Sequence, residues 1–306
     1  MAKPILVVGE TNVDIVLRGA LPALGKEVVA DDCVLTLGSA SAICAMGLAR
    51  LGNAVVFVSR IGADFCGDYC LGLIDAAGID TSNVTRDPTL KTGVTVSITS
   101  AADRALVTYI GSIAAVTEAD VADDLLESAG HLHVSSFYLQ SGLRDGCARL
   151  FARAQQHGLT TSLDPGYDPH ERWNGVTEVL PSVDVFLPNE FELAAIAASG
   201  DRAEAVAALE SGRTRIVVKM GRGGAMTREA GETIRVPAFA IDAIDTTGAG
   251  DSFNAGFLHA FVRGRPVREC LVFGNASGAL STRALGGTPG QPTLDEVMAL
   301  MAAEPR

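Results

Sequence analysis

The sequence predicts an α/β fold in which a doubly wound, mostly parallel sheet is flanked by helices and carries a small antiparallel sheet. Short β-branched runs alternate along the chain with helical patterns of small and apolar residues. This alternation is typical of parallel sheets that are covered on both faces. Two further segments alternate like exposed strands. No Pro-, Gly- or Ser-rich linker divides the 306 residues, so we expect a single domain over 1–306.

The elements of the main sheet follow in chain order. The first strand is the continuous apolar run Ile5-Leu6-Val7-Val8, which is typical of a strand buried on both faces. Strands are expected at 5–8, 55–58, 131–135, 160–163, 183–187 and 216–219. Helices are expected at 42–51, 68–77, 119–128, 144–157, 191–198, 202–209, 251–262 and 267–280. Ligands of such sheets bind beyond the carboxyl ends of the strands.

The small antiparallel sheet is expected from two segments at about 12–37 and 92–111. In the second segment Val94, Val96 and Ile98 alternate with polar residues, so one face of the strand is polar. We therefore expect these segments to project from the main domain.

The composition limits the partners and the compartment. Twenty-four basic and 36 acidic residues give a net charge of −12, which disfavours nucleic acid and an anionic membrane surface as partners. No charged-then-apolar leader follows Met1, and no apolar run approaches the length of a membrane span. The six cysteines form no Cys-x-x-Cys pair, so we expect free thiols and a cytoplasmic protein.

The most informative motif is Asp245-Thr246-Thr247-Gly248-Ala249-Gly250-Asp251. It is a glycine-rich turn that leads into a helix, because apolar residues recur every four positions at Phe253, Phe257 and Phe261. A helix start presents unpaired N–H groups to an anion, and small residues allow a close approach. A carboxylate at that point is a good base for an alcohol that attacks a phosphoryl group. The alternative is that Asp251 only caps the helix.

This motif, with Phe253 and Gly256 after it, resembles the C-terminal motif of the ribokinase-like (PfkB) carbohydrate kinases. The resemblance implies that Gly248, Ala249 and Gly250 form an anion hole for the transferred phosphoryl group and that Asp251 is the general base. It covers almost the whole chain. Neither a Walker-type loop nor a Gly-x-Gly-x-x-Gly motif occurs at this turn.

The same resemblance assigns two further segments. Asn12 and Asp14, which follow the first strand, correspond to residues that bind substrate hydroxyls, although both residue types also favour plain turns. Asn189 and Glu192 resemble an element that acts near the phosphates of ATP through Mg²⁺ and its water shell. Mg²⁺ needs few protein oxygens, but the pair also has the spacing of a helix capping box.

Three more features follow from the family pattern. Lys219, Gly221 and Gly224 lie in a turn that borders the nucleotide in that family. Asp245 and Thr247, with carbonyls near 281–287, resemble its monovalent-cation site, which would bind K⁺. The small antiparallel sheet corresponds to a lid over the sugar and often to a homodimer contact.

The chain departs from the family at the sugar pocket. After Gly38 the family usually has a second glycine, and an Asn that binds the sugar follows five residues after the first. This chain has Ser39 and Ile43 at these positions. An apolar branched side chain cannot bond a hydroxyl, and an unpaired polar group against it is unfavourable. We therefore expect intact phosphoryl-transfer machinery and an altered substrate pocket.

These observations predict an ATP-dependent kinase that phosphorylates an alcohol group of a small sugar-like molecule, with ATP and Mg²⁺ as cofactors. A nucleoside kinase of the same fold, in which Ile43 packs near an apolar base, is an alternative. A non-catalytic sugar or nucleotide sensor is a third possibility, and a dehydrogenase is a distant fourth.

Overall fold

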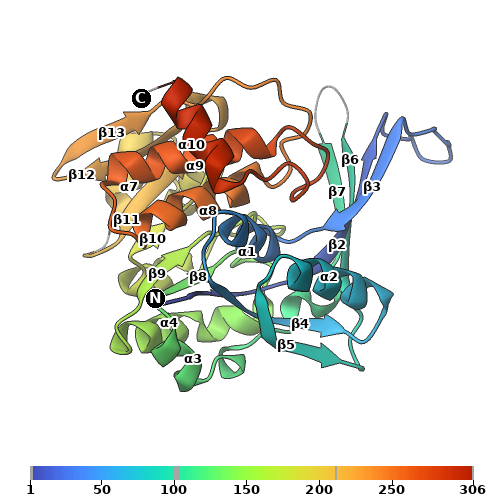
Figure 1. Cartoon of the computed structure of the whole chain (residues 1–306), viewed down its shortest axis with the longest axis horizontal. Coiled ribbons are helices and arrows are strands. Elements are labelled where there is room, and N and C mark those ends of the chain that lie inside the picture. The colour runs from blue at the N-terminus through green and yellow to red at the C-terminus, as the bar shows by residue number, and fades with distance from the viewer. Residues whose placement is uncertain (1–2, 100–103, 211, 305–306) are drawn as a thin grey trace.

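The computed structural model describes residues 3–99, 104–210 and 212–304. A nine-stranded sheet has the order β13-β12-β11-β10-β9-β8-β1-β4-β5 (Figure 1). From β11 to β5 all neighbouring strands are parallel, and β12 and β13 add an antiparallel hairpin. The strands are β1 (Ile5–Val8), β4 (Val55–Gly62), β5 (Asp80–Asp87), β8 (His131–Val134), β9 (Thr160–Leu163), β10 (Val185–Phe186), β11 (Arg215–Lys219), β12 (Ala225–Glu229) and β13 (Glu232–Val236).

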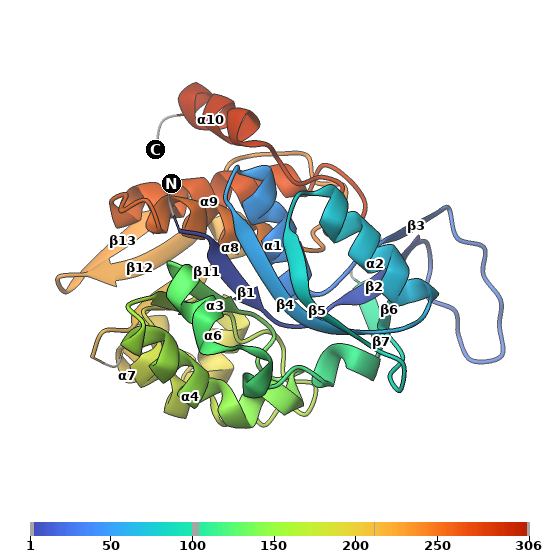
Figure 2. The same ribbon diagram turned by 60° about the horizontal axis from the view of Figure 1, so that its bottom comes forward.

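Helices cover both faces of this sheet (Figure 2). In β1, Ile5 and Val7 belong to one apolar core and Leu6 and Val8 to the other, as the continuous apolar run predicted. The first core is covered by α1 (Ala40–Arg50), α2 (Phe65–Ala76), α8 (Ala249–Phe261) and α9 (Val267–Ser281), with α10 (Leu294–Ala303) against α9. The second is covered by α3 (Asp123–Ser128), α4 (Ser141–Gln156), α5 (Val176–Val179), α6 (Glu190–Ala197) and α7 (Arg202–Leu209).

A second sheet of order β3-β2-β6-β7 stands beside the main one (Figure 1). It consists of β2 (Asn12–Arg18), β3 (Asp32–Leu37), β6 (Gly93–Thr99) and β7 (Arg104–Tyr109). Its two hairpins are antiparallel, as expected, and a parallel pairing of β2 with β6 joins them. We call this sheet the lid. In the lid, the polar row Thr36, Asp14, Thr95 and Thr108 crosses all four strands on one face.

Several elements differ from the sequence-based expectation. The predicted helix at 119–128 is a 3-10 turn at Glu118–Asp120 followed by α3, and the predicted strand at 183–187 is only two residues long. The edge strands β5 and β13, the strand β12 between β13 and β11, and the helices α5 and α10 were not predicted. The sequence of β5, DTSNVTRD, lacks an apolar alternation because the strand is an edge of the sheet and is largely solvent-exposed.

The carboxyl ends of the parallel strands meet at one edge of the main sheet. Glu10, Asp164 and Asn189 follow β1, β9 and β10 within three residues, and Lys219 is the last residue of β11. This edge therefore brings together polar residues that are far apart in sequence. Within the described residues, no helix is both long and apolar enough to cross a lipid bilayer.

We expect α8 to tolerate no side chain at Gly256, because a Cβ there would lie 2.4 Å from Ser277 Oγ and 2.5 Å from Phe273 O on α9. Gly256→Ala should lower the free energy of unfolding by about 1–3 kcal/mol, the usual effect of overpacking. Gly72 of α2 is the matched control because a Cβ there would face open space. Gly72→Ala should stabilise by up to about 1 kcal/mol through helix propensity. Urea denaturation that gives equal changes in both variants would contradict this packing.

Candidate active site

The first turn of α8 presents unpaired backbone amides. Gly248 is the N-cap residue and has a left-handed backbone with φ 71°. The N–H of Ser252 makes the first helical hydrogen bond, 2.9 Å to Gly248 O, so the amides of Gly250 and Asp251 precede the helical ladder. The N–H of Ala249 donates to Thr246 O at 3.2 Å. The helix start can therefore bind an anion chiefly through the amides of Gly250 and Asp251.

A buried ion pair lies beneath this turn. Lys219 Nζ, at the end of β11, lies 2.5 Å from Asp164 Oδ2, and both side chains are largely buried. Asn254 of α8 donates its amide to the same carboxylate oxygen at 2.5 Å. A Cβ on Gly250 would lie 3.6 Å from Lys219 Nζ, so the ammonium faces the first turn of α8. The pair thus joins β9, β11 and α8 and places a cation at the anion-binding turn.

The carboxylates around Lys219 influence one another. Burial and the charge of Asp164 raise the pKa of Asp251 to about 8, although Lys219 lowers it. Burial and Asp164 likewise raise the pKa of Glu192 to about 7. Burial also disfavours the charge on Asp164, but Lys219 and the hydrogen bond from Asn254 outweigh it and lower the pKa of this carboxyl. Asp251 is therefore poised to accept a proton near neutral pH.

Asn189 and Glu192 form a capping box at the start of α6. Asn189 Oδ1 accepts from the N–H of Glu192, and Glu192 Oε2 accepts from the N–H of Asn189, both at 2.8 Å. The capping alternative therefore holds, and it places the buried Glu192 carboxyl beside Asp164 and Lys219. Such a sparse oxygen set fits Mg²⁺, which keeps most of its water ligands.

Asn12, Asp14 and Gly38 lie together where the lid joins the main sheet. Asn12 Nδ2 donates to Asp14 Oδ1 at 2.8 Å and to Thr95 Oγ1 at 3.2 Å. A Cβ on Gly38 would lie 2.0 Å from Asp14 Oδ1. Gly38 is therefore required for the chain to pass directly over this carboxylate.

Ser39 adopts a backbone conformation that normally requires glycine, with φ 71° and ψ 136°. Its hydroxyl donates to Glu10 O at 2.5 Å and accepts from the N–H of Ala42 at 3.0 Å. Ser39 thereby caps α1 and ties it to the end of β1. The hydroxyl compensates for part of the backbone strain.

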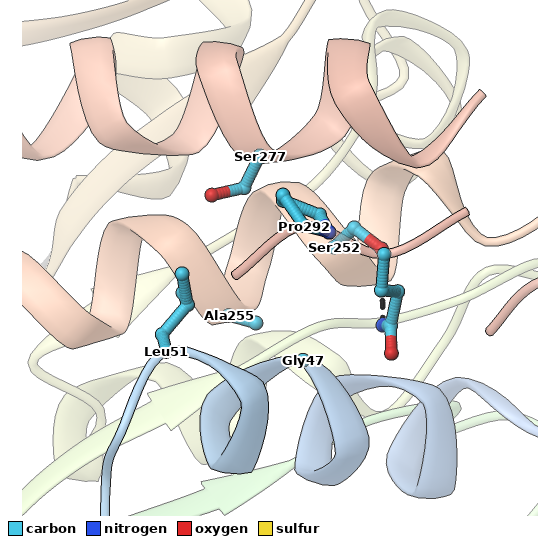
Figure 3. Close-up of a pocket in the computed structure, with 7 residues that line it drawn as sticks. Gly47, Leu51, Ser252, Ala255, Ser277 and Pro292 are labelled. Carbon is cyan, nitrogen blue, oxygen red and sulfur yellow. Dashed lines mark hydrogen bonds between the residues drawn. The ribbon is translucent and has the colours of Figure 1, made fainter. Parts of the chain in front are cut away.

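Ile43 packs against Gly287, which in turn lies against the turn before α8. Its Cδ1 lies 2.4 Å from the position of a Cβ on Gly287, and a Cβ on Gly248 would lie 2.7 Å from Gly287 Cα. Ile43, Gly287 and Gly248 are thus packed in series, so Ile43 supports the anion-binding turn. Gln291 Nε2 donates to Ile43 O at 2.8 Å and to Ser252 Oγ at 3.1 Å, which connects α1 to α8 across the small gap shown in Figure 3.

Asp245 braces the turn before α8. Its Oδ1 accepts from the N–H of Thr247 at 3.0 Å and from Thr247 Oγ1 at 2.9 Å. Its Oδ2 accepts from the N–H of Gly286 at 2.8 Å. The turn of Asp245 and Thr247 therefore lies beside the 281–287 segment, and these are the two segments that resemble the cation site of the family.

The turn after β11 contains Gly221 and Gly224, which both have a positive φ. A Cβ on Gly224 would lie 2.0 Å from Val236 O, so this glycine allows β13 to approach closely. A Cβ on Gly221 would face open space. Gly224 therefore has a packing role irrespective of any nucleotide.

The roles of Glu10, Asp164 and Asn254 in this site were not expected from the sequence. Glu10 is buried between β1 and the start of α1, and Asn254 of α8 binds Asp164. Glu10 lies in the same segment as Asn12 and Asp14. A charged residue so soon after a buried strand could have indicated that it belongs to the site. The partners of Asn254 lie 35 and 90 residues away, and no local pattern reveals them.

Comparison with known proteins decides the family. The model of the pfkB family carbohydrate kinases matches residues 2–294. The chain belongs to this family. It is 30% identical to the ATP-dependent ribose-1-phosphate kinase of Halopiger xanaduensis over 97% of this chain and 98% of that one. It is 26% identical to the ribokinase of Haemophilus influenzae, over 97% and 98%.

Solved structures agree with this assignment to the pfkB carbohydrate kinases. The ribokinase of Arabidopsis thaliana complexed with ribose and ATP is 26% identical and superposes with a TM-score of 0.84, over 98% of this chain and 99% of that one. A ribokinase II from E. coli in complex with ATP and Mg²⁺, 23% identical, matches the fold with a TM-score of 0.87 over 99% and 100%. The chain is an ATP-dependent sugar phosphotransferase with the ribokinase-like fold.

We expect Lys219 to set the pH dependence of this pfkB kinase. The value of kcat/KM should rise with pH through about 8 as Asp251 loses its proton. Lys219→Met should move this inflection to higher pH, because the lysine charge lowers the pKa of Asp251. Lys219→Arg keeps the charge and is the control. Identical inflections in the two variants, measured by ADP release, would refute this influence.

Proposed function

We propose that this kinase transfers the γ-phosphoryl group of ATP to a primary alcohol of a small sugar-like substrate, with Asp251 as the general base. The observation that carries the proposal is the position of Asp251 in the first turn of α8, beside open amides and above Lys219. Its raised pKa suits a group that must take a hydroxyl proton near neutral pH.

The reaction then needs little covalent chemistry from the protein. Asn12 and Asp14 orient the alcohol, whose proton passes to Asp251 as its oxygen attacks phosphorus. The amides of the 248–251 turn stabilise the charge on the transferring group, and Gly248 and Ala249 shape that turn. Such preorganised donors often supply the largest part of catalysis. The lid excludes water from the transferring group.

The nucleotide is assigned to the edge formed by Asn189, Glu192 and Lys219, with Gly221 and Gly224 in the adjoining turn. Glu192 would hold Mg²⁺ there through its water shell, and the ion would neutralise charge on the phosphates. K⁺ is assigned to the turn of Asp245 and Thr247, since this turn lies against the 281–287 segment. Assays in which sodium replaces potassium test that assignment, and equal rates would refute it.

Asp251→Asn is expected to abolish most phosphoryl transfer while ATP binding stays close to wild type. A general base is typically worth about 10²–10⁴ in rate. Steady-state kinetics together with calorimetric titration of ATP measure both properties. A variant that keeps more than about a tenth of the wild-type kcat falls short of that range and would show that Asp251 is not the base.

Glu192→Gln is expected to raise the Mg²⁺ concentration needed for half-maximal activity more than the KM of the sugar. The glutamine oxygen can still accept from Asn189 N–H, so the capping box survives and α6 keeps its start. Mg²⁺ titrations of the ATP turnover rate measure the effect. If the titration curve does not change, Glu192 serves only as a cap.

The finer proposal concerns the sugar. Ile43 replaces an Asn that binds the sugar in the family pattern, and Ser39 replaces a glycine, so ribose and fructose should be poor substrates. An unpaired buried hydroxyl costs about 1–3 kcal/mol, which corresponds to roughly tenfold to a hundredfold in kcat/KM. The double variant Ser39→Gly, Ile43→Asn should improve both sugars relative to the native substrate. Efficient use of either sugar by the wild type would contradict an altered pocket.

The lid face opposite Asp14 favours a homodimer. Leu35, Ile15, Val96 and Val107 form an apolar row across its four strands, and Val107 is 73% exposed. A second copy of the lid is the occupant that we propose. Sedimentation velocity of the wild type and Val107→Glu tests it, and an unchanged sedimentation coefficient would refute the contact.

A nucleoside kinase and a non-catalytic sensor are not favoured, because the named sequence relatives are sugar kinases. An ADP-release screen against sugars, polyols and nucleosides separates all three functions. The sensor predicts no turnover with any alcohol.

A further inference from the structure

The end of β1 carries a buried carboxyl group that the phosphoryl-transfer mechanism does not use. Glu10 is 1% exposed, and Ser41 donates to it from its hydroxyl at 2.6 Å and from its N–H at 3.3 Å. Burial raises the pKa of Glu10, and the hydrogen bonds from Ser41 lower it. Glu10 also raises the pKa of Asp251, so the two carboxyls are close enough to interact. A ligand donor near Glu10 would stabilise its charge, and an anion would oppose it.

A second group at the same place has an unused hydrogen-bond acceptor. Gln140 is 1% exposed, and its Nε2 donates to Ser135 O at 2.5 Å. Because a carbonyl can only accept, this contact fixes the orientation of the amide. Within the described residues Gln140 Oε1 has no hydrogen-bond partner. A buried acceptor without a donor is unfavourable unless a ligand supplies one.

Glu10 and Gln140 meet across Gly9. A Cβ on Gly9 would lie 2.0 Å from Ser41 Oγ, the partner of Glu10, and 3.0 Å from Gln140 Nε2. Ser39, in the sugar segment, bonds the backbone of Glu10. Glu10 is therefore tied to the segment assigned to the sugar, and the amide of Gln140 lies beside Ser41, the partner of its carboxyl group. The cation of the site, Lys219, is bound by Asp164.

We propose that Glu10 and Gln140 are specificity-determining residues that select a neutral or amino-bearing polyol and reject sugar acids and sugar phosphates. This inference rests on the proposed function, because it assigns the substrate class of the same pocket. Both side chains offer oxygen lone pairs to hydroxyl or ammonium donors. A carboxylate or phosphate on the substrate would instead face the carboxylate of Glu10.

The test compares substrates that keep the same primary hydroxyl. D-glucose and D-glucosamine are compared with D-gluconate, and D-ribose with ribose 1-phosphate. We expect the neutral or amino member to exceed the anionic one by about tenfold or more in kcat/KM, because juxtaposed like charges are strongly unfavourable. Calorimetric binding to Asp251→Asn repeats the comparison without turnover.

Glu10→Gln removes the charge and keeps an acceptor for Ser41. It should reduce the discrimination against each anionic member severalfold, while Glu232→Gln on the exposed β13 strand leaves it unchanged. Thermal melting verifies that both variants fold. If Glu10→Gln does not fold, the proposal is tested by the wild-type comparison and by Gln140→Glu. The latter variant should strengthen the rejection of anions.

The proposal is overturned if the wild type favours an anionic member, distinguishes none of the pairs, or discriminates unchanged in Glu10→Gln. Failure of the proposed function gives a different result. In that case no alcohol is phosphorylated, and selective binding of neutral polyols to Asp251→Asn would still support the inference about the pocket.

Discussion

The site depends on the buried ion pair of Lys219 and Asp164. A lone buried charge is very unfavourable, so each of these side chains requires the other. Their contact, together with Asn254, holds the ends of β9 and β11 against the first turn of α8. The same pair determines the electrostatics, because Asp164 raises and Lys219 lowers the pKa of both Asp251 and Glu192. One contact thus sets both the position and the protonation of the proposed catalytic groups.

Close backbone approach is the second constraint. Gly38 lies against the Asp14 carboxylate, and Gly248 lies against Gly287, with no room for a Cβ at either place. These contacts bring the start of α1, the start of α8 and the 281–287 segment to one point. Because Ile43 packs on Gly287, a residue expected to alter only the sugar pocket also supports the anion-binding turn. Substitutions at Ile43 therefore act on both sugar binding and phosphoryl transfer.

Ser39 shows how a residue that alters the sugar pocket is compatible with this close backbone packing. Its backbone conformation is unfavourable for any residue with a Cβ, yet its hydroxyl makes two hydrogen bonds that join α1 to β1. Ser41 then adds two bonds to the Glu10 side chain. Ser39, which stands in place of a glycine, and Ser41 thus bind the backbone and the buried carboxyl group of Glu10, and these contacts underlie the proposed preference for uncharged polyols.

The sequence by itself determined the parallel sheet, its two helical layers and the glycine turn before α8. These features are local: continuous apolar runs, a recurrence of apolar residues every four positions, and small residues in a turn are all legible along the chain. It did not reveal β5 and β13, because edge strands that are partly exposed lack a clear apolar alternation. Only the tertiary structure decided that Lys219 pairs with Asp164, that Ile43 packs on Gly287, and that Gln140 lies beside Ser41, the partner of the Glu10 carboxyl group. Those contacts join residues separated by 55 to more than 200 positions, and they arise because parallel strands bring their carboxyl ends to the same edge.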